Sequence, residues 1–504
     1  MTFAAALAAQ RPDEIALRAT DGDWTWAQVD AALRPLVNGM LAARYRPKRR
    51  VAIYAENSGQ TVLYYAAATL AGCSAVAVNY HLTPEETAYI LTHSQADLLI
   101  VDDSTAERGW VAARLAGVPA VVGGSGAVTG AISLEQATKF IGDAEPPTSH
   151  EPRPTMVYTS GTTGTPKGVE LPWTSWVGGA DIDEHVERLA QNSMVAHGRH
   201  LIVGPMYHSG PITGTRLFLG GAPVTVLGRF DGEKFLATIE RDRIGSTIVV
   251  PTHLQRVMAL PPPARDAHDL SSLTFMLQVG AKFPEPDKRA AIEWLTAAGR
   301  PDVLFESYGA SEVGTTCMIS AVEWLERPGS VGRAVPGFEA MILDEDDKPA
   351  PPGTEGRLFF RADGHGMSYV DGTGTSAGEP FTLGEIGVMD EAGYVWITDR
   401  ASDMVVSGGV NIYPAEAEKV LAAHPGVADV ACIGVPHPDL GEALVALVVP
   451  IDPFNEPAAE DLLAHCRDNL TLYKCPREIL FVEALQRTPV GKVDKKAMRA
   501  PFWA

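Results

Sequence analysis

The sequence predicts an α/β protein with a large N-terminal domain, built from two doubly wound lobes and a β-rich lobe, and a small α+β C-terminal domain. Three observations lead to this prediction. Strand-length apolar runs alternate with helical patterns before residue 340, short strands and turns rich in Gly and Pro follow Gly337, and a new alternating pattern begins at Gly408. Strands that alternate with helices form parallel sheets with both faces covered.

The first lobe is predicted from repeated helix and strand patterns. Apolar residues at 25–43 recur with helical period, and a buried-strand run follows at 51–55. Residues 123–154 are rich in Gly, Pro and Thr, which predicts a connecting loop. Between these segments we expect helices at 60–71 and 84–94 and strands at 74–78 and 97–101.

Later runs predict the second lobe and the two domains. A Gly-rich segment at 364–378 favours the β-rich lobe, and a helix at 414–423 with a strand at 429–435 marks the C-terminal domain. We expect an N-terminal domain at 1–399 and a C-terminal domain at 403–504, joined at 399–402. The strands expected in the second lobe are 201–203, 224–227, 246–250, 274–279 and 302–305.

Charge and cysteine content exclude several classes of protein. A net charge of −21 argues against nucleic-acid binding and against electrostatic docking on anionic membranes. Five widely spaced cysteines without a Cys-x-x-Cys pair indicate buried, reduced thiols and not a disulfide frame or a metal site. The apolar start at 1–9 lacks a basic region and predicts a helix, and no apolar run reaches the ~18 residues that span a bilayer. We expect a cytoplasmic enzyme with small-molecule partners, and a homodimer stays open.

One stretch carries the strongest chemical signal. Residues 158–168 read Tyr-Thr-Ser-Gly-Thr-Thr-Gly-Thr-Pro-Lys-Gly, a run of hydroxyls and glycines around Lys167. Glycines let backbone N–H groups turn inward, while the hydroxyls donate to phosphate oxygens and the lysine adds a charge. The spacing differs from the Walker loop, because the Ser and Thr precede the lysine. The stretch predicts a polyphosphate-binding loop.

Four other stretches accompany this loop in a fixed order. Together with it they resemble the adenylate-forming superfamily of acyl-CoA synthetases, adenylation domains and luciferases, over essentially the whole chain. Within the superfamily the chain looks most like bacterial fatty-acyl or bile-acid-type CoA ligases, judged by Tyr-His-Ser-Gly-Pro at 207–211 and the run at 287–294. The four stretches are Pro-Met-Tyr-His-Ser-Gly at 205–210, Glu-Ser-Tyr-Gly-Ala-Ser-Glu at 306–312, the segment 397–416, and Arg-Thr-Pro-Val-Gly-Lys-Val at 487–493.

The resemblance implies a site for ATP. Tyr308 would stack on adenine and Ser311 would bond the α-phosphate. Glu312 would bind Mg²⁺ with Thr159 as a second oxygen ligand, as the preference of magnesium for hard oxygens requires. Lys492 would bridge the attacking carboxylate and the α-phosphate and stabilise the charge of the transition state. The implied ATP- or AMP-binding residues are Thr159, Ser160, Gly161, Thr162, Thr163, Gly164, Lys167, Gly280, Ala281, Glu306, Ser307, Tyr308, Gly309, Ser311, Glu385 and Arg400.

The resemblance also implies an acyl tunnel that His208 gates, which makes His208 a catalytic candidate beside Lys492 and Glu312. Small residues along the tunnel suggest a roomy cavity. The implied acyl-pocket residues are His208, Ser209, Gly210, Gly214, Gly309 and Gly314.

A hinge at Ser402 would give the C-terminal domain two positions. In one position Lys492 enters the site for adenylation. In the other, Gly408 and Gly409 face the acyl-adenylate and admit the thiol of coenzyme A. Arg229 and Lys474 are the candidates for binding CoA phosphates.

Several positions depart from the family pattern. The ribose-binding stretch reads Leu-Gly-Glu at 383–385 where Thr-Gly-Asp is usual, and the preceding segment lacks the usual aromatic residue. Ser402 replaces the common Lys or Asp of the hinge. Lys282 and Phe283 interrupt the small residues after Ala281, and Lys282 would favour a substrate with a second anionic or polar group.

The expected reaction joins a carboxylic acid to CoA through an acyl-adenylate, with ATP, Mg²⁺ and coenzyme A as cofactors. A fatty acid, a steroid side-chain acid or a similar bulky acid is the expected substrate. Three alternatives stay open: an aryl-acid CoA ligase, a free-standing enzyme that loads a carrier protein, and a catalytically silent binding protein on the same scaffold.

Overall fold

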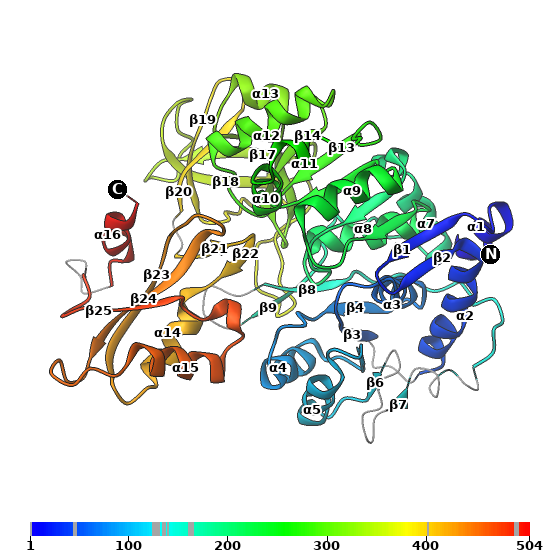
Figure 1. Ribbon diagram of the computed structural model, residues 1–504, viewed down its shortest axis with the longest axis horizontal. Coiled ribbons are helices and arrows are strands. Elements are labelled where there is room, and N and C mark those ends of the chain that lie inside the picture. Colours follow the sequence, from blue (N-terminus) through cyan, green and yellow to red (C-terminus); the bar gives the residue numbers. More distant parts are fainter. Residues whose placement is uncertain are drawn as a thin grey trace.

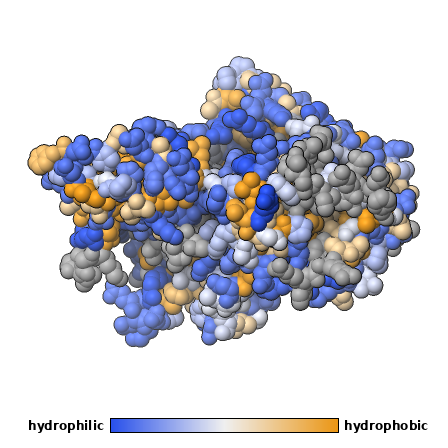
Figure 2. All heavy atoms as spheres, turned by 90° about the horizontal axis from the view of Figure 1, so that it is seen from below, coloured by the Kyte–Doolittle hydropathy of each residue, from blue (hydrophilic) through white to orange (hydrophobic). Residues whose placement is uncertain are grey.

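The computed structural model describes residues 3–43, 48–122, 132–133, 138, 141–159, 166–400, 403–487 and 493–503. A large N-terminal domain of two α/β lobes and a β-rich lobe is followed by a small C-terminal domain, which lies at the left in Figure 1. This is the mixed α/β architecture that the sequence predicts. The face seen in Figure 2 is largely hydrophilic, and its hydrophobic side chains form small separate patches.

The first lobe holds a seven-stranded sheet with the order β7-β6-β5-β3-β4-β8-β9. Its strands are parallel except for the β8–β9 hairpin. The Thr83 side chain and Glu86 form a capping box that fixes the start of α4 at the predicted residue, Pro84. The elements are β3 (Arg50–Tyr54), α3 (Gly59–Leu70), β4 (Ser74–Ala77), α4 (Pro84–Ser94), β5 (Leu98–Val101), α5 (Ala106–Ala116), β6 (Ala120–Val122), β7 (Ile132–Ser133), β8 (Met156–Thr159) and β9 (Lys167–Glu170).

The second lobe contains the parallel part of a thirteen-stranded sheet. Strands β10 to β14 form this part, as predicted, and β14 runs on past the expected end at residue 305. The elements are α7 (Ile182–Ala190), η1 (Ser193–His197), β10 (His200–Ile202), α8 (Ser209–Leu219), β11 (Val224–Val226), α9 (Gly232–Asp242), β12 (Ser246–Val249), α10 (Pro251–Met258), α11 (Pro262–Arg265), β13 (Phe275–Gln278), α12 (Glu285–Ala297) and β14 (Leu304–Ala310).

The N-terminal segment joins the second lobe, which the sequence analysis did not anticipate. The chain begins with α1, so the helix expected there is confirmed, and β1 pairs in parallel with β11. The α2 helix then leads into the first lobe, with Thr25 as its N-cap. These elements are α1 (Phe3–Gln10), β1 (Ile15–Ala19), β2 (Gly22–Thr25) and α2 (Trp26–Ala42).

The β-rich lobe continues the sheet of the second lobe. The β14–β15 hairpin turns the chain, and antiparallel strands then extend the sheet from β16 through β20 to β17. The lobe therefore shares a sheet with its neighbour and is not a separate layer. Its elements are β15 (Gly314–Ser320), α13 (Ala321–Glu326), β16 (Ser330–Ala334), β17 (Phe338–Leu343), β18 (Gly356–Ala362), β19 (Glu385–Met389) and β20 (Val395–Arg400).

The C-terminal domain is built around the long hairpin β23–β24, which two helices cover. The predicted helix and strand are both present, and the strand is longer than expected. The elements are β21 (Val405–Ser407), β22 (Val410–Ile412), α14 (Pro414–Ala422), β23 (Val427–His437), β24 (Gly441–Pro450), α15 (Ala459–Asn469), η2 (Leu472–Lys474), β25 (Glu478–Phe481), α16 (Lys495–Arg499) and η3 (Ala500–Phe502).

Two other expectations bear on the whole chain. All five cysteines are buried and free, which confirms the prediction of unpaired thiols. Among the residues that the structure describes, no helix has both the length and the apolar character needed to cross a membrane.

Candidate active site

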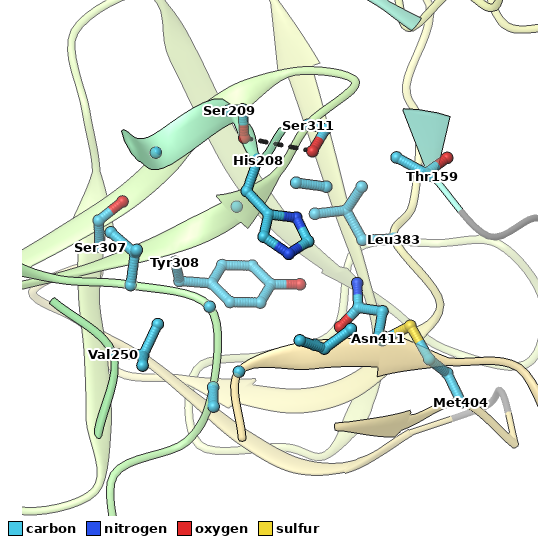
Figure 3. A pocket seen from close by; sticks show the side chains of 18 of the residues that line it. Thr159, His208, Ser209, Val250, Ser307, Tyr308, Ser311, Leu383, Met404 and Asn411 are labelled. Atoms are coloured by element: carbon cyan, nitrogen blue, oxygen red, sulfur yellow. Dashed lines mark hydrogen bonds between the residues drawn. The ribbon is translucent and has the colours of Figure 1, made fainter. Parts of the chain in front are cut away.

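A cavity of about 1220 Å³ lies between the two domains. Its wall brings together the β8–β9 hairpin, the start of α8, the β14–β15 turn and the loop before β22, which belong to four of the five stretches singled out in the sequence. Figure 3 shows His208 between the Ser209–Ser311 pair and Tyr308, while Met404 and Asn411 reach the same space from the C-terminal domain.

The β8–β9 hairpin positions the two ends of the predicted polyphosphate loop. Thr159 and Lys167 are paired across it. The loop itself, with the candidates Ser160, Gly161, Thr162, Thr163 and Gly164, lies outside the described residues.

Tyr369 is a site residue that the sequence analysis missed. The Lys167 ammonium lies 4.6 Å from the centre of the Tyr369 ring, a cation–π arrangement. Burial, followed by the nearby Glu312 carboxylate, raises the pKa of Tyr369. Its position within the Gly-rich segment gave no signal, because nothing local fixes which way such a segment folds.

Two hydrogen bonds lie beside the β14–β15 turn, and the first of them joins the first lobe to the second. Thr159 Oγ1 donates to Glu312 Oε1 over 3.2 Å, and the Ser209 and Ser311 hydroxyls are 3.3 Å apart. A carboxylate next to a hydroxyl is a donor set of hard oxygens, which fits Mg²⁺. No group of three or more His, Cys, Asp or Glu side chains that could hold a metal occurs among the described residues, so substrate phosphates would have to complete such a site.

The expected nucleotide wall is assembled in the structure. Gly280, Ala281, Ser307, Tyr308 and Gly309 all line the cavity. At Gly309 a Cβ atom would come within 1.9 Å of the Gly314 carbonyl oxygen, so the β14–β15 hairpin itself requires this glycine. Gly314, with φ of +73°, packs against the Thr174 hydroxyl in the same way.

Glu306 reaches the cavity from β14 and forms an ion pair with Lys288 of α12. The Lys288 side chain is 2% exposed, and its ammonium lies 4.6 Å from the centre of the Trp324 ring. Burial raises the pKa of Glu306 and lowers that of Lys288, and the opposite charge of each partner offsets part of the shift. Lys288 thus positions the Glu306 carboxylate through this ion pair, a role that the sequence did not reveal.

The ribose-type stretch also lies in the cavity wall. Glu385 is buried at the start of β19, directly opposite Arg400 of β20. The Arg400 side chain lies outside the part that the structure describes. The expectation that no aromatic residue precedes this stretch is wrong, because Phe381 is buried there and packs on Phe360 with ring centres 6.1 Å apart.

His208 is the N-cap residue of α8 and faces the cavity. Burial lowers its pKa to about 4, so the ring is neutral at pH 7, and its buried Nε2 has no hydrogen-bond partner among the described residues. A neutral imidazole can donate to or accept from a substrate carboxyl group without adding charge.

The glycines expected in the acyl pocket have different roles. A Cβ at Gly210 would lie 3.6 Å from Ile248 and Val279, which also line the cavity, so this glycine widens it. Gly214 does not line the cavity. It packs against Ile202 of β10, where a Cβ would come within 2.3 Å, and we correct our expectation for it accordingly.

The C-terminal domain closes one side of the cavity with Gly408 and Gly409. Their φ angles are +59° and +81°, and a Cβ at Gly409 would come within 2.9 Å of Val250. Glycine is therefore needed for this close approach between the domains. Ser402 and Lys492 lie outside the described residues.

The two CoA candidates lie in contrasting environments. Arg229 is exposed and is absent from the cavity lining. Lys474 is buried and pairs with Glu86 of α4 at 2.9 Å and with Glu416 of α14 at 2.7 Å. The structure thus gives Lys474 a role between the domains, where its charge is already matched by two carboxylates.

Two family models match this chain. One, described as AMP-binding enzyme, matches residues 4–370, and the other, described as AMP-binding enzyme C-terminal domain, matches residues 416–492. The chain is 30% identical to an indoleacetate–CoA ligase of Aromatoleum aromaticum, over 97% of this chain and 95% of that protein. It is also 30% identical to a long-chain fatty-acid–CoA ligase of Mycobacterium tuberculosis, over 96% of this chain and 94% of the relative.

Solved structures share the whole architecture. The amide bond synthetase McbA from Marinactinospora thermotolerans is 27% identical, with a TM-score of 0.83 and complete coverage of both chains. The o-succinylbenzoate CoA synthetase from Bacillus subtilis is 25% identical in two states. With its product analogue OSB-NCoA the TM-score is 0.79, with 98% of this chain and 96% of that chain covered. With the acyl-adenylate OSB-AMP the TM-score is 0.64, with 98% and 97% covered.

Proposed function

Since the chain belongs to the AMP-binding enzyme family and is an AMP-forming acid–CoA ligase, we propose that it converts a bulky carboxylic acid, of the fatty or steroid side-chain type, into its CoA thioester. Ligases of this family use ATP, Mg²⁺ and CoA. The observation that carries the proposal is Gly210, which lines the shared cavity and leaves room beside Ile248 and Val279.

The proposed reaction has two steps. The substrate carboxylate attacks the α-phosphorus of ATP, which releases pyrophosphate and leaves an acyl-adenylate. The CoA thiol then attacks the acyl carbon, and AMP leaves with one oxygen of the original carboxylate. Such displacements need position and charge stabilisation more than covalent help from the protein.

The residues in the cavity suit these demands. Bound Mg²⁺, held by Glu312 and Thr159, would neutralise phosphate charge. The Lys167 ammonium adds a positive charge at the end of the polyphosphate loop, and Tyr308 offers a ring face to adenine. His208 would hold the carboxyl group of the acid substrate. The Glu306 carboxylate would face the adenine base of ATP. Lys492 is proposed to stabilise the charge that builds up between carboxylate and α-phosphate.

The position of the C-terminal domain supports its part in the second step. Gly408 and Gly409 line the cavity and leave no side chain in the way of a pantetheine arm. The higher TM-score to the product-analogue state than to the acyl-adenylate state of the Bacillus subtilis enzyme agrees with this arrangement. We propose a boundary at 399–402, around which the domain turns between the two steps.

An aryl acid is the second candidate substrate, because a CoA ligase for indoleacetate is as similar to the chain as one for long-chain fatty acids.

The acceptor is tested together with the acid. Purified protein, ATP and a panel of fatty, steroid and aryl acids are offered CoA, a pantetheinyl carrier domain or an amine, and AMP and the acyl product are measured. We expect AMP and a CoA thioester from a bulky acid. Transfer to the carrier alone, or no AMP with any acid, would overturn the proposal.

Lys492→Ala separates the two steps. It should abolish pyrophosphate release from acid and ATP, while a supplied acyl-adenylate is still converted to the thioester. Equal loss of both half-reactions would contradict the role of Lys492.

We further propose a cytoplasmic location, where ATP and CoA are available. Five free cysteines, all of them buried, agree with a reducing compartment.

A further inference from the structure

Arg216 is a partly buried cation in the cavity wall that the proposed mechanism does not use. It lies on α8 and lines the cavity. Its Nη1 donates to the Ser175 carbonyl oxygen, and its Nη2 donates to Thr213 Oγ1 over 2.7 Å. The buried Nε has no hydrogen-bond partner among the described residues. A guanidinium has five N–H donors, so three of them have no partner among the described residues.

No carboxylate of the described chain forms an ion pair with Arg216. Burial lowers its pKa to about 10, which leaves it charged at neutral pH. A charge held in a protein interior without a counter-ion is costly, and such a charge is normally paired. The missing partner is therefore expected to be part of a ligand.

Two other cations along the cavity wall, Lys474 and Lys282, differ from Arg216. Lys474 is paired with Glu86 and Glu416. Lys282, which the sequence suggested for a second polar group, is exposed, and its charge acts on the Glu306 carboxylate. Arg216 is thus better placed than Lys282 to hold an anion deep in the pocket.

Its place along α8 sets the distance from the reaction centre. Ser209 begins α8 beside His208 and Ser311, where the reacting carboxyl group is proposed to lie (Figure 3). Arg216 is two helical turns further along, which is roughly 10 Å at the rise of an α-helix. The polar groups Ser175 and Thr213 line the cavity beside it, so this end of the pocket is suited to a charged group.

We propose that Arg216 binds a second anionic group of the acid substrate, at the end of the molecule away from the carboxylate that is activated. The preferred substrates are then dicarboxylates or similar acids whose two charged groups are roughly 10 Å apart. The inference rests on the proposed acid–CoA ligase activity and names its substrate class. A bidentate ion pair between Arg216 and the second carboxylate would strengthen the binding of a diacid. A monoacid would leave the guanidinium without a counter-ion.

Matched pairs of acids test the inference in the wild-type enzyme. One pair is octanoate and octanedioate, and another is phenylpropanoate and its para-carboxy derivative. The kcat/KM for AMP formation is measured with ATP and CoA. We expect the acid with the distal carboxylate to be preferred in at least one pair, and a preference for the monoacid in every pair would overturn the inference. Absence of AMP with every acid would instead remove the proposed function on which it rests.

Arg216→Met removes the charge and keeps much of the side-chain length. We expect it to lower kcat/KM for the preferred diacid on the order of 100-fold and to raise that for the matched monoacid. Arg216→Lys should restore part of the diacid activity. Arg114→Met, at an exposed arginine of α5, is the matched control and should change neither value. An equal fall for both members of a pair would show a structural role and overturn the inference. If Arg216→Met does not fold, the inference is tested by the preference of the wild-type enzyme within the matched pairs and by the kcat/KM values of Arg216→Lys.

Discussion

Thr159 Oγ1 donates a hydrogen bond of 3.2 Å to Glu312 Oε1 and so joins residues that are 153 positions apart. Thr159 ends a strand of the first lobe, and Glu312 lies in the β14–β15 turn of the second. The contact places a hydroxyl and a carboxylate at the point where the polyphosphate loop begins. This is where the proposed mechanism needs Mg²⁺.

Glu312→Gln should lower the rate of acyl-adenylate formation by about two orders of magnitude and raise the Mg²⁺ concentration needed for half-maximal rate. The amide keeps the hydrogen bond from Thr159 but removes the charge that a cation requires. Pyrophosphate release over a Mg²⁺ titration measures both effects. Glu326→Gln, at an exposed carboxylate of α13, serves as the control. A normal Mg²⁺ dependence in Glu312→Gln would rule out metal binding by this residue.

Tyr369→Leu should raise the KM for ATP about two- to fivefold, because the ring face under the Lys167 ammonium contributes roughly 0.5–1 kcal/mol. Tyr369→Phe keeps the ring face and should retain more of the affinity for ATP. Initial rates over an ATP titration at saturating acid separate the two variants. Equal KM values for the Leu and Phe variants would show that the ring face does not matter.

Three histidines, one buried and two partly buried, should make the folded protein less stable in acid. Burial lowers the pKa of His208 to about 4 and the pKa values of His200 and His253 to about 3, from an ordinary value of 6.5. Between those values the unfolded chain binds more protons than the folded one, so stability present above pH 6.5 is lost as the pH falls toward 4. Each histidine contributes at most about 1.4 kcal/mol per pH unit.

Thermal unfolding from pH 8 to pH 4 measures this loss. The midpoint should fall less steeply in His200→Gln, which has no imidazole to protonate. His365→Gln, at an exposed histidine, should behave like the wild type. Parallel curves for the wild type and His200→Gln would refute the assignment.

The ion pair between buried Lys474 and partly buried Glu86 should hold the C-terminal domain in the position needed for CoA transfer. Thr471 Oγ1 adds a hydrogen bond of 2.5 Å to the same carboxylate, 385 positions away in sequence. Glu86→Gln keeps an oxygen for the helix cap but removes the charge that faces Lys474. We expect the conversion of acyl-adenylate to thioester to slow roughly tenfold, since breaking a buried ion pair is costly, while adenylation is retained.

Glu85→Gln is the matched control, one residue away on the exposed side of α4. It should leave both half-reactions unchanged. The exposed pair of Arg256 and Asp439 also links the domains, at 3.0 Å, and its removal should have little effect because exposed ion pairs contribute about 0–1 kcal/mol. A slower adenylation step in Glu86→Gln, with a normal CoA step, would contradict the proposed role of the pair.

The sequence predicted those helices and strands whose position is set by residues within or next to them. The α4 helix starts at Pro84 because Thr83 and Glu86 cap it, and the strands of both lobes appear as short apolar runs. Thr159, Tyr308 and Glu312 were recognised because their motifs combine residue types that the chemistry needs. Phe381 was missed just after the Gly-rich segment, although it is buried four residues before Glu385.

Other features depend on contacts between distant segments. The fit of Gly214 against Ile202, the approach of Tyr369 to Lys167 and the pairing of Lys474 with Glu86 follow from the folded arrangement. The charge of Arg216 lies within a helical pattern, and nothing in that pattern shows that the side chain lines a cavity without a counter-ion. A sequence gives the type of such a residue, and only packing decides whether it is a surface charge or part of a pocket.

Transfer of oxygen from the acid to the nucleotide tests the central claim most directly. An acid that the enzyme accepts is labelled with ¹⁸O in its carboxylate and incubated with ATP and CoA, and the nucleotide and phosphate products are analysed by mass spectrometry. Activation through an acyl-adenylate predicts one ¹⁸O atom in AMP and none in pyrophosphate. Label in inorganic phosphate, together with ADP, would mean attack at the γ-phosphorus and would contradict the proposed mechanism.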